Sequence, residues 1–276
     1  MKSNSILKAA VAATLVVGSA QAMATGYVNL PTSGASSAYI ECNATGSYGQ
    51  GTSIRPTTTA NNTCAIFAEP SGDGYTQKSS TTRPIVMNNT YTGFTNVTVG
   101  TFQDQVWYKA STKSYSYKIR VNMNTTPYAE LPSEEDPTEL EDAYFEINDI
   151  QRTGFTNIVG NVQVAYRVDP VTDEVLFRAG RTSTAVPAVA PYSLPTSAAA
   201  PFDASTIDFT TDVNNEDPDG SSPKDSAHMY VKFEDAAGNT SGTRFTTASG
   251  TVKFKQLGQE GQPLITIEAN GYKPSF

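Results

Sequence analysis

The sequence predicts an all-β protein, an antiparallel β-sandwich of jelly-roll or Ig-like type with at most one short helix. The composition is rich in Thr, Ser, Asn, Gly and Tyr and poor in Leu, Glu and Lys, which favours pleated strands and turns over helices. Short runs of β-branched and aromatic residues are separated by clusters of turn-forming residues, the pattern of antiparallel strands.

Ten segments fit the strand pattern best, and they lie at residues 97–102, 105–110, 115–121, 145–147, 162–167, 174–177, 206–210, 229–233, 252–256 and 264–268. The clearest hairpin turns at residues 111–114. The pentapeptide Thr-Gly-Phe-Thr-Asn occurs at residues 92–96 and again at 153–157, each time before a two-strand pattern. It marks either a structural duplication, with a second hairpin turning at residues 169–173, or a chance identity in a Thr-rich chain.

Residues 1–24 predict a secretory signal peptide. Lys2 and Lys8 supply its basic start, residues 9–17 its apolar run, and Ala22 or Ala24 the small residue before the cleavage point. The apolar run is shorter than the roughly 20 residues that span a bilayer, and no later segment is apolar enough to span one as a helix. We therefore expect an exported chain without a transmembrane helix, secreted or at the cell surface, with the periplasm as the alternative.

The mature chain is acidic. Loss of Lys2 and Lys8 with the signal takes the formal net charge from −8 to −10. This balance excludes nucleic acid and anionic lipid as expected partners. About 250 residues remain, enough for one large domain or two modest ones.

Two β-rich segments, residues 25–181 and 204–276, lie on either side of a stretch rich in Ala, Pro, Ser and Thr at residues 182–203. Its prolines favour extended polyproline geometry. The stretch is either a hinge between two lobes or a strap along one domain. The one helix that the sequence suggests begins at Asp136, with Pro137 in the first helical position and Glu139 completing a capping-box-like start.

Cys42 and Cys64 are the only cysteines. In an oxidising compartment an isolated pair of this kind predicts one disulfide, which would stabilise the fold by about 3 kcal/mol in the chain-entropy model. A redox role would favour a Cys-x-x-Cys motif or a basic neighbour, and neither is present.

An oxygen-rich loop at residues 212–220, followed by Asp225, predicts either a structural calcium site or a turn with solvated charges. Calcium takes six to eight hard oxygen ligands, and a glycine-containing turn lets several converge. The spacing is not that of an EF-hand, because the twelfth position counted from Asp212 is Pro223. The candidate Ca²⁺ ligands are Asp212, Asn214, Asp217, Asp219 and Asp225.

Two neighbouring segments carry opposite charge. Residues 105–129 contain four basic residues and no acid, and residues 134–142 contain six acids and no base. Such blocks either guide head-to-tail association of subunits or are independent solvated faces.

The sequence contains no recognisable reactive centre. His228, the only histidine, lies at the start of an expected strand, and no Gly-x-Ser-x-Gly elbow accompanies it, so we interpret it as a strand-end or core residue. Carboxylate pairs for glycoside cleavage meet in space and leave no local signature, so that chemistry stays open. Aromatic residues of the first hairpin, such as Trp107 and Tyr108, are either a core face or a sugar-binding platform.

These observations favour a non-enzymatic, exported β-sandwich protein with a structural or adhesive role at the cell surface or in a secreted matrix. Its expected partners are copies of itself or other surface and matrix components, with glycans as a further class. The alternatives are a secreted glycan-binding or glycan-active protein and an outer-membrane β-barrel. Pro274 near the end of the chain and the short expected strands disfavour the barrel.

Overall fold

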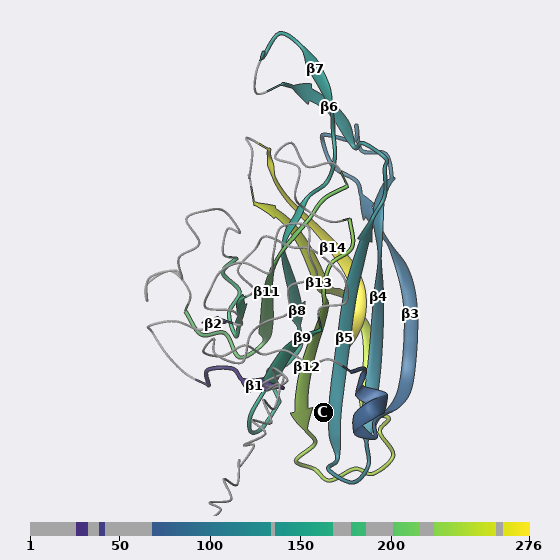
Figure 1. The fold of residues 1–276 in the computed structure, drawn as a ribbon, viewed down its shortest axis with the longest axis vertical. Helices are drawn as coiled ribbons and strands as arrows, with labels where there is room; N and C mark the ends of the chain where they lie inside the picture. Colours follow the sequence, from purple (N-terminus) through teal and green to yellow (C-terminus); the bar gives the residue numbers. More distant parts are fainter. Residues whose placement is uncertain are drawn as a thin grey trace, which may run out of the picture.

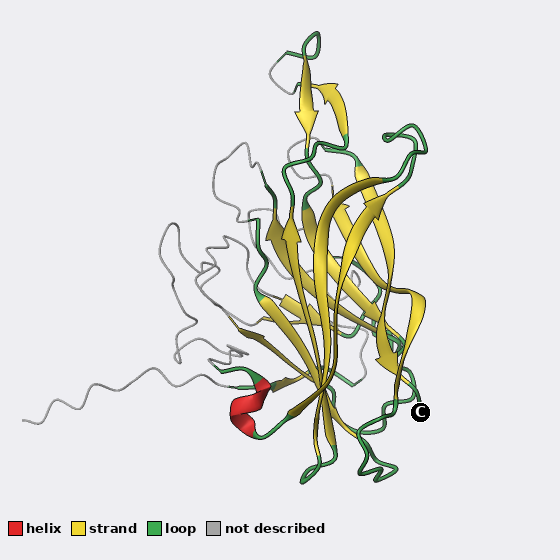
Figure 2. Cartoon of the chain, turned by 90° about the vertical axis from the view of Figure 1, so that its right-hand side faces the viewer, coloured by secondary structure: helices red, strands yellow, loops and turns green. Residues whose placement is uncertain are grey.

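Strands with alternating inward and outward side chains form two antiparallel sheets that pack face to face (Figure 1, Figure 2). The computed structural model describes residues 26–32, 39–41, 68–133, 136–167, 178–185, 201–215, 224–257 and 262–276. Every pairing between the described strands is antiparallel. The predicted all-β, antiparallel sandwich is confirmed.

Each large sheet has six strands. Sheet A has, in spatial order, β1 (Val28–Asn29), β9 (Gln163–Arg167), β12 (His228–Glu234), β5 (Ser114–Met123), β4 (Val97–Lys109) and β3 (Thr76–Met87). Sheet B has β14 (Leu264–Pro274), β13 (Phe245–Leu257), β8 (Ile147–Thr153), β11 (Thr206–Val213), β10 (Arg178–Gly180) and β2 (Tyr39–Glu41). A separate two-stranded sheet consists of β6 (Ala129–Pro132) and β7 (Leu140–Ala143).

One hydrophobic core fills the space between the sheets. Sheet A contributes residues such as Phe102 and Ile119, and sheet B contributes Ile150, Phe209 and Phe254. The rings of Phe102 and Phe254 lie 5.1 Å apart between their centroids, so the two sheets are in direct contact. The burial of these apolar side chains is the main favourable term that holds the sheets together.

Strands from before and after residues 182–203 alternate within both sheets. β12 lies between β9 and β5, and β11 lies between β8 and β10. The two ends of the stretch also meet, because the Asp203 amide donates a hydrogen bond to the Arg181 carbonyl oxygen at 2.8 Å. The stretch therefore begins and ends at one point of the fold, and residues 25–181 and 204–276 build one sandwich rather than two separate lobes.

The first predicted hairpin is confirmed. β4 and β5 pair around a turn at residues 110–113. The buried rings of Tyr108 and Tyr115 contact each other across the hairpin at 4.8 Å between centroids. Trp107 points to the other face, where it is also buried and its Nε1 donates to Gln105 Oε1 at 3.1 Å. These aromatic side chains are buried, so the alternative of a sugar-binding platform on this hairpin is wrong.

The second predicted hairpin is not tested, because its turn at residues 169–173 and its second strand at residues 174–177 lie outside the described residues. Its first strand is present as β9 in sheet A, and the next described strand, β10, belongs to sheet B. The two copies of the pentapeptide differ in environment, because Phe94 is 69% exposed and Phe155 is fully buried.

The helix predicted at residues 136–139 is also wrong, because these residues form a turn between β6 and β7. Asp136 does act as a cap there: its Oδ1 accepts hydrogen bonds from the Thr138 amide at 3.0 Å and the Thr138 hydroxyl at 2.7 Å. A capping side chain stabilises an Asx turn as readily as a helix start. The only helix among the described residues is the 3₁₀ turn η1 (Pro70–Asp73).

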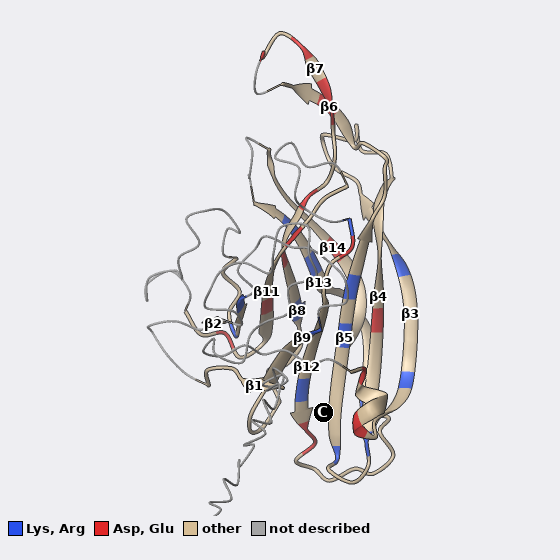
Figure 3. Cartoon of the chain, in the orientation of Figure 1, with Lys and Arg blue, Asp and Glu red and all other residues tan. Residues whose placement is uncertain are grey.

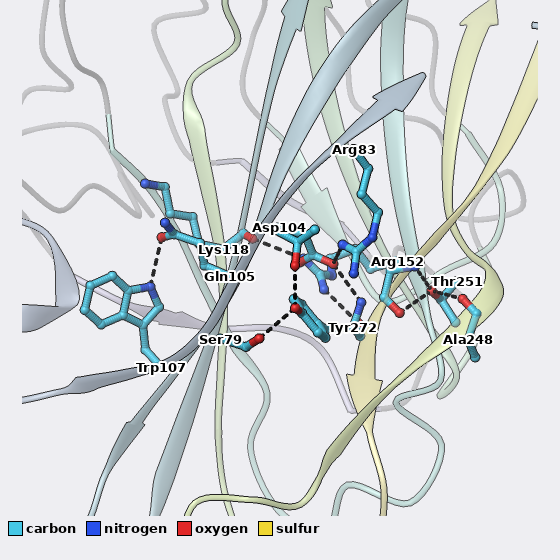
Figure 4. Close-up of polar contacts among 12 residues, drawn as sticks. Ser79, Arg83, Asp104, Gln105, Trp107, Lys118, Arg152, Ala248, Thr251 and Tyr272 are labelled. Carbon is cyan, nitrogen blue, oxygen red and sulfur yellow. Dashed lines mark hydrogen bonds and ion pairs between the residues drawn. The ribbon is translucent and has the colours of Figure 1, made fainter. Parts of the chain in front are cut away.

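A buried ion pair joins the two sheets (Figure 4). Arg152 Nη1 on β8 lies 3.0 Å from Asp104 Oδ1 on β4, and both side chains are at most 1% exposed. Asp104 Oδ2 also accepts the backbone amide of Tyr272 on β14 at 2.7 Å, and Arg152 Nη2 donates to the carbonyl oxygen of the same residue at 2.8 Å. The pair therefore fixes the position of β14 as well as that of the two strands that carry it.

Tyr272 extends this contact to the edge of sheet A. Its hydroxyl lies 2.6 Å from both Ser79 Oγ and Thr81 Oγ1 on β3, and the Arg83 guanidinium lies over its ring at 4.8 Å. The neighbouring Gly271 lets β14 lie close to β13, because a Cβ there would lie 2.4 Å from a methyl of Val252. The edge strands β3 and β14 are thus held side by side.

Asp104→Asn tests the inter-sheet pair. The variant keeps the size of the side chain but leaves the Arg152 guanidinium buried without its counter-charge, so we expect the free energy of unfolding to fall by about 3–5 kcal/mol. Denaturant unfolding followed by Trp107 fluorescence measures the change. Asp225→Asn is the matched control, because Asp225 lies 3.7 Å from Arg120 and both side chains are about one-third exposed, so its loss should stay below about 1 kcal/mol. Equal losses in both variants would contradict the expected role.

Candidate functional site

Four polar side chains form a square on the outer face of sheet B. β8 and β11 pair with Asp208 opposite Gln151 and Thr210 opposite Asp149. All four residues are at most 2% exposed, which is unusual for the outward-facing side of a sheet. Lys255 on β13 is the cross-strand neighbour of Asp149 on the other side of β8. Two buried carboxylic acids in this square are therefore candidates for shifted pKa values.

Asp208 receives hydrogen bonds from two neighbours. The Tyr39 hydroxyl on β2 donates to Asp208 Oδ2, and Gln151 Nε2 lies 3.3 Å from the same oxygen. Gly180 on β10 lets the Tyr39 ring lie across the intervening strand, because a Cβ at this position would be 2.7 Å from a ring carbon. The start of the 182–203 stretch packs over the square, with the Ser183 carbonyl oxygen 3.1 Å from Gln151 Nε2.

Asp149 and Asp208 face the same side of the sheet on the paired strands β8 and β11. Burial raises the pKa of Asp208 from 3.8 to about 6, while interactions with Asp149, Tyr39 and Gln151 and the charge of Lys255 oppose this rise. Asp208 can therefore exchange a proton in the weakly acidic range, but its side chain is fully buried and is not open to a substrate.

The pKa of Asp208 predicts a pH-dependent stability. A carboxyl group with a raised pKa binds its proton more tightly in the folded than in the unfolded state, so the free energy of unfolding should fall between about pH 4 and pH 6 and then level off. Asp208→Asn removes the titrating group. We expect this variant to match the wild type near pH 4 and to exceed it by on the order of 2 kcal/mol at pH 8.

Urea unfolding from pH 4 to pH 8 measures both curves. Asp73→Asn, a change at an exposed acid on another part of the chain, is the control and should leave the wild-type slope unchanged. Parallel curves for the wild type and Asp208→Asn would contradict the assignment.

A second polar cluster lies on the outer face of sheet A around Glu69. Lys118 Nζ donates to Glu69 Oε1 at 3.1 Å, and the Tyr230 hydroxyl donates to Oε2 at 3.0 Å. Arg167 also donates to Oε1 from β9. Glu69 directly precedes η1, so this carboxylate attaches η1 to three strands of sheet A.

His228 borders the Glu69 cluster, with Nδ1 3.8 Å from Glu69 Oε1. Burial and the nearby charges of Lys118, Arg120 and Arg167 lower the pKa of His228 to about 2. The imidazole is therefore neutral across the ordinary pH range. It is a buried residue at the start of β12, which confirms the interpretation of His228 as a strand-end or core histidine.

Glu69→Gln tests the second cluster. Lys118 is 4% exposed, and burial already lowers its pKa, so loss of the neighbouring carboxylate leaves an ammonium group in a poorly hydrated position. Because Glu69 itself is 30% exposed, we expect a loss of only about 1–3 kcal/mol in the free energy of unfolding.

Addition of Lys118→Met to Glu69→Gln should restore part of the loss, since the stranded charge is then removed. A double variant less stable than Glu69→Gln alone, in the same denaturant measurement, would show that the charge of Lys118 is not the cause.

The structure describes three of the five candidate calcium ligands, Asp212, Asn214 and Asp225. Asp212 and Asn214 lie at the end of β11 in sheet B, whereas Asp225 lies beside β5 of sheet A, where Asn122 Nδ2 donates to it at 2.6 Å. The described residues contain no cluster of three or more His, Cys, Asp or Glu side chains that would hold a metal ion. Asp217 and Asp219 lie outside the described residues, so calcium binding stays a prediction. Cys42 and Cys64 lie outside them too, and so does their predicted disulfide.

Exposed charged side chains lie on β6 and β7. These two strands form an arm that projects beyond the sandwich (Figure 1) and pairs with no other described strand. Three consecutive residues of β7, Leu140, Glu141 and Asp142, are exposed, so both faces of this strand meet solvent. Figure 3 shows that the charged residues of the arm are acidic. At its base, the ring of Tyr128 contacts Tyr91 edge to face at 6.2 Å between centroids.

The loop at residues 88–96 adds apolar surface beside the base of the arm. Tyr91 is 40% exposed and Phe94 is 69% exposed, and Leu140 on the arm itself is 62% exposed. Large apolar side chains that gather at one end of a protein are typical of an interaction site. The acidic block at residues 134–142 was visible in the sequence, but its place on a projecting hairpin was not, because the same residues suggested a helix.

The fold and these sites define a two-sheet β-sandwich with polar clusters buried on both outer faces and an acidic, partly apolar arm at one end. No protein-family model, curated protein or solved structure matches the chain. The described residues form no helix of the length and apolar character that crossing a membrane requires.

Proposed function

We propose that the protein is an exported, non-enzymatic β-sandwich with a structural or adhesive role at the cell surface or in a secreted matrix, and that the β6–β7 arm is its contact element. The single observation that carries this proposal is the arm itself. An isolated two-stranded hairpin is marginally stable in water, and this one has a strand exposed on both faces. Contact with a partner would supply the burial that the arm lacks.

The polar clusters support a scaffold role. Asp104 and Arg152 link the two sheets, and Glu69 attaches η1 to sheet A. The pair formed by Asp149 and Asp208 is covered on its own face of the sandwich. Each of these groups contacts other groups within the fold, whereas the charged and apolar side chains of the arm are exposed to solvent.

The signal-like residues 1–24 support export, because a basic start, a short apolar run and small residues before a cleavage point direct a chain out of the cytoplasm. The apolar surface near the arm supports attachment to a macromolecule. Tyr91 and Phe94 in the loop near its base and Leu140 on the arm itself are exposed apolar side chains that a partner could cover.

Removal of the arm tests the proposal. Ala129 and Ala143 are Cα partners across the arm, so residues 130–142 can be replaced by an Asn-Gly turn without moving the strands on either side. We expect the shortened chain to be exported and to melt within about 5 °C of the wild type, since the arm adds little to the core. It should be recovered from the culture medium, whereas the intact chain stays with the cell-surface or matrix fraction.

Fractionation of a bacterial culture that expresses the full chain measures retention at the cell surface. Mass spectrometry of the mature N-terminus measures export and processing. Glu268→Gln, a change at an exposed acid on β14 outside the arm, is the control and should partition like the wild type. An unprocessed chain in the cytoplasm would contradict the proposed export. Equal retention of the intact and shortened chains would contradict the role of the arm.

A further inference from the structure

The arm has one sign of charge and no partner among the described strands. Its described acids are all exposed, and they are Glu130, Asp136, Glu139, Glu141 and Asp142. The sequence contains no Lys or Arg between Arg120 and Arg152. Leu140 is the first residue of β7, directly before the acids Glu141 and Asp142, and is 62% exposed. A surface that fits the arm would therefore offer ammonium or guanidinium groups beside apolar or aromatic contact.

The opposite end of sheet A has that character. Strand register places four lysines near the start of β5, namely Lys78, Lys109, Lys113 and Lys232. The salt bridges between described residues include none of them. Two exposed acids, Asp73 and Glu234, share this end, so basic residues prevail there without being alone.

Three of these lysines rest on aromatic rings. The Nζ atoms of Lys78 and Lys109 each lie 5.7 Å from a ring centroid, of Tyr108 and Tyr75 respectively. Lys232 Nζ lies 5.0 Å from the centroid of Tyr27. The rings hold the ammonium groups in place by cation–π attraction, which leaves the charge available to an outside acid.

The two surfaces lie at opposite ends of the same strand. β5 begins at Ser114, which pairs with Lys109, and ends at Met123, from which the chain continues into the arm. Ten residues of extended strand span about 30 Å. The arm of one molecule therefore does not reach its own lysines, but it can reach those of another copy (Figure 3).

We propose that the acidic arm docks on the lysine-bearing end of a second copy of this chain, so that molecules associate head to tail. This inference rests on the proposed function and names the partner of the arm. The two contact surfaces are different and lie at opposite ends, which is a heterologous contact that does not close in pairs and generates linear chains. Opposite charges steer the encounter, and salt screens it over about 8 Å at physiological ionic strength.

Sedimentation velocity on the purified mature chain tests this proposal at low and high salt. At low salt we expect a concentration-dependent series of oligomers, and at about 0.5 M salt we expect a shift toward monomer. A wild-type chain that stays monomeric at low salt up to about 100 µM would overturn the inference, since steering charges act best under that condition.

Two charge-reversed variants locate the contact. The arm variant carries Glu139→Lys, Glu141→Lys and Asp142→Lys, and the end variant carries Lys78→Glu, Lys109→Glu and Lys113→Glu. Like charges then face each other in every self-contact, so each variant alone should associate at least about tenfold more weakly than the wild type. Lys224→Glu, a change at an exposed lysine outside the lysine-bearing end, is the control and should associate like the wild type.

The mixture of the two variants is the decisive experiment. The acidic arm of the end variant then meets the unchanged lysines of the arm variant, and the basic arm meets the acidic end, so an equimolar mixture should regain oligomers. Such rescue also shows that both variants are folded. A mixture that remains monomeric, or single variants that associate like the wild type, would overturn the inference.

The two proposals fail in different ways. If the purified chain is monomeric but removal of the arm still releases it from the cell-surface fraction, the arm has a partner other than a second copy, and only the inference fails. If retention does not depend on the arm, the proposed function fails whatever the purified chain does.

Discussion

The ion pair between Asp104 and Arg152 is the contact on which the rest of the structure depends. It lies between the two sheets, is shielded from water, and is shared by both backbone groups of Tyr272. An isolated buried charge is costly, so each partner confines the other to one geometry. The hydrophobic effect drives the sheets together. Because hydrogen bonds are directional, this pair sets which strands face each other.

The pair also explains why the chain folds as one unit. Asp104 and Arg152 precede the Ala- and Pro-rich stretch, and Tyr272 follows it, so the buried network is complete only when both segments are in place. Both sheets also need strands from both segments, because strands from before and after the stretch are interleaved in each sheet. A stretch whose two ends hydrogen-bond to each other needs no role as a hinge between separate lobes.

Local sequence patterns predicted part of most long strands, but they missed β3 and all but the first residue of β8. β4 and β5 were predictable because β-branched and aromatic runs flank a short turn, and hairpin partners are neighbours in sequence. Asp136 was ambiguous, since one capping side chain serves either a turn or a helix.

The sites were harder to predict than the fold. The polar residues that matter are separated by long stretches of sequence, as with Asp149 and Asp208 or Glu69 and Tyr230, and only strand register brings them together. The sequence drew attention instead to acids that are close along the chain. Of these, the block at residues 134–142 became an exposed arm, while Asp212 and Asp225 lie on different sheets. Local acid density therefore indicated the arm and not its geometry.

The central claim, that one buried network makes both segments a single cooperative unit, is tested most directly by native-state hydrogen exchange of the whole chain. The account predicts that the slowest amides of β4, β5 and β8 and those of β13 and β14 exchange with the same opening free energy, equal to that of global unfolding. If the strands of residues 204–276 opened together at a clearly lower free energy while β4 and β5 stayed protected, the two segments would be separate folding units and the account would be wrong.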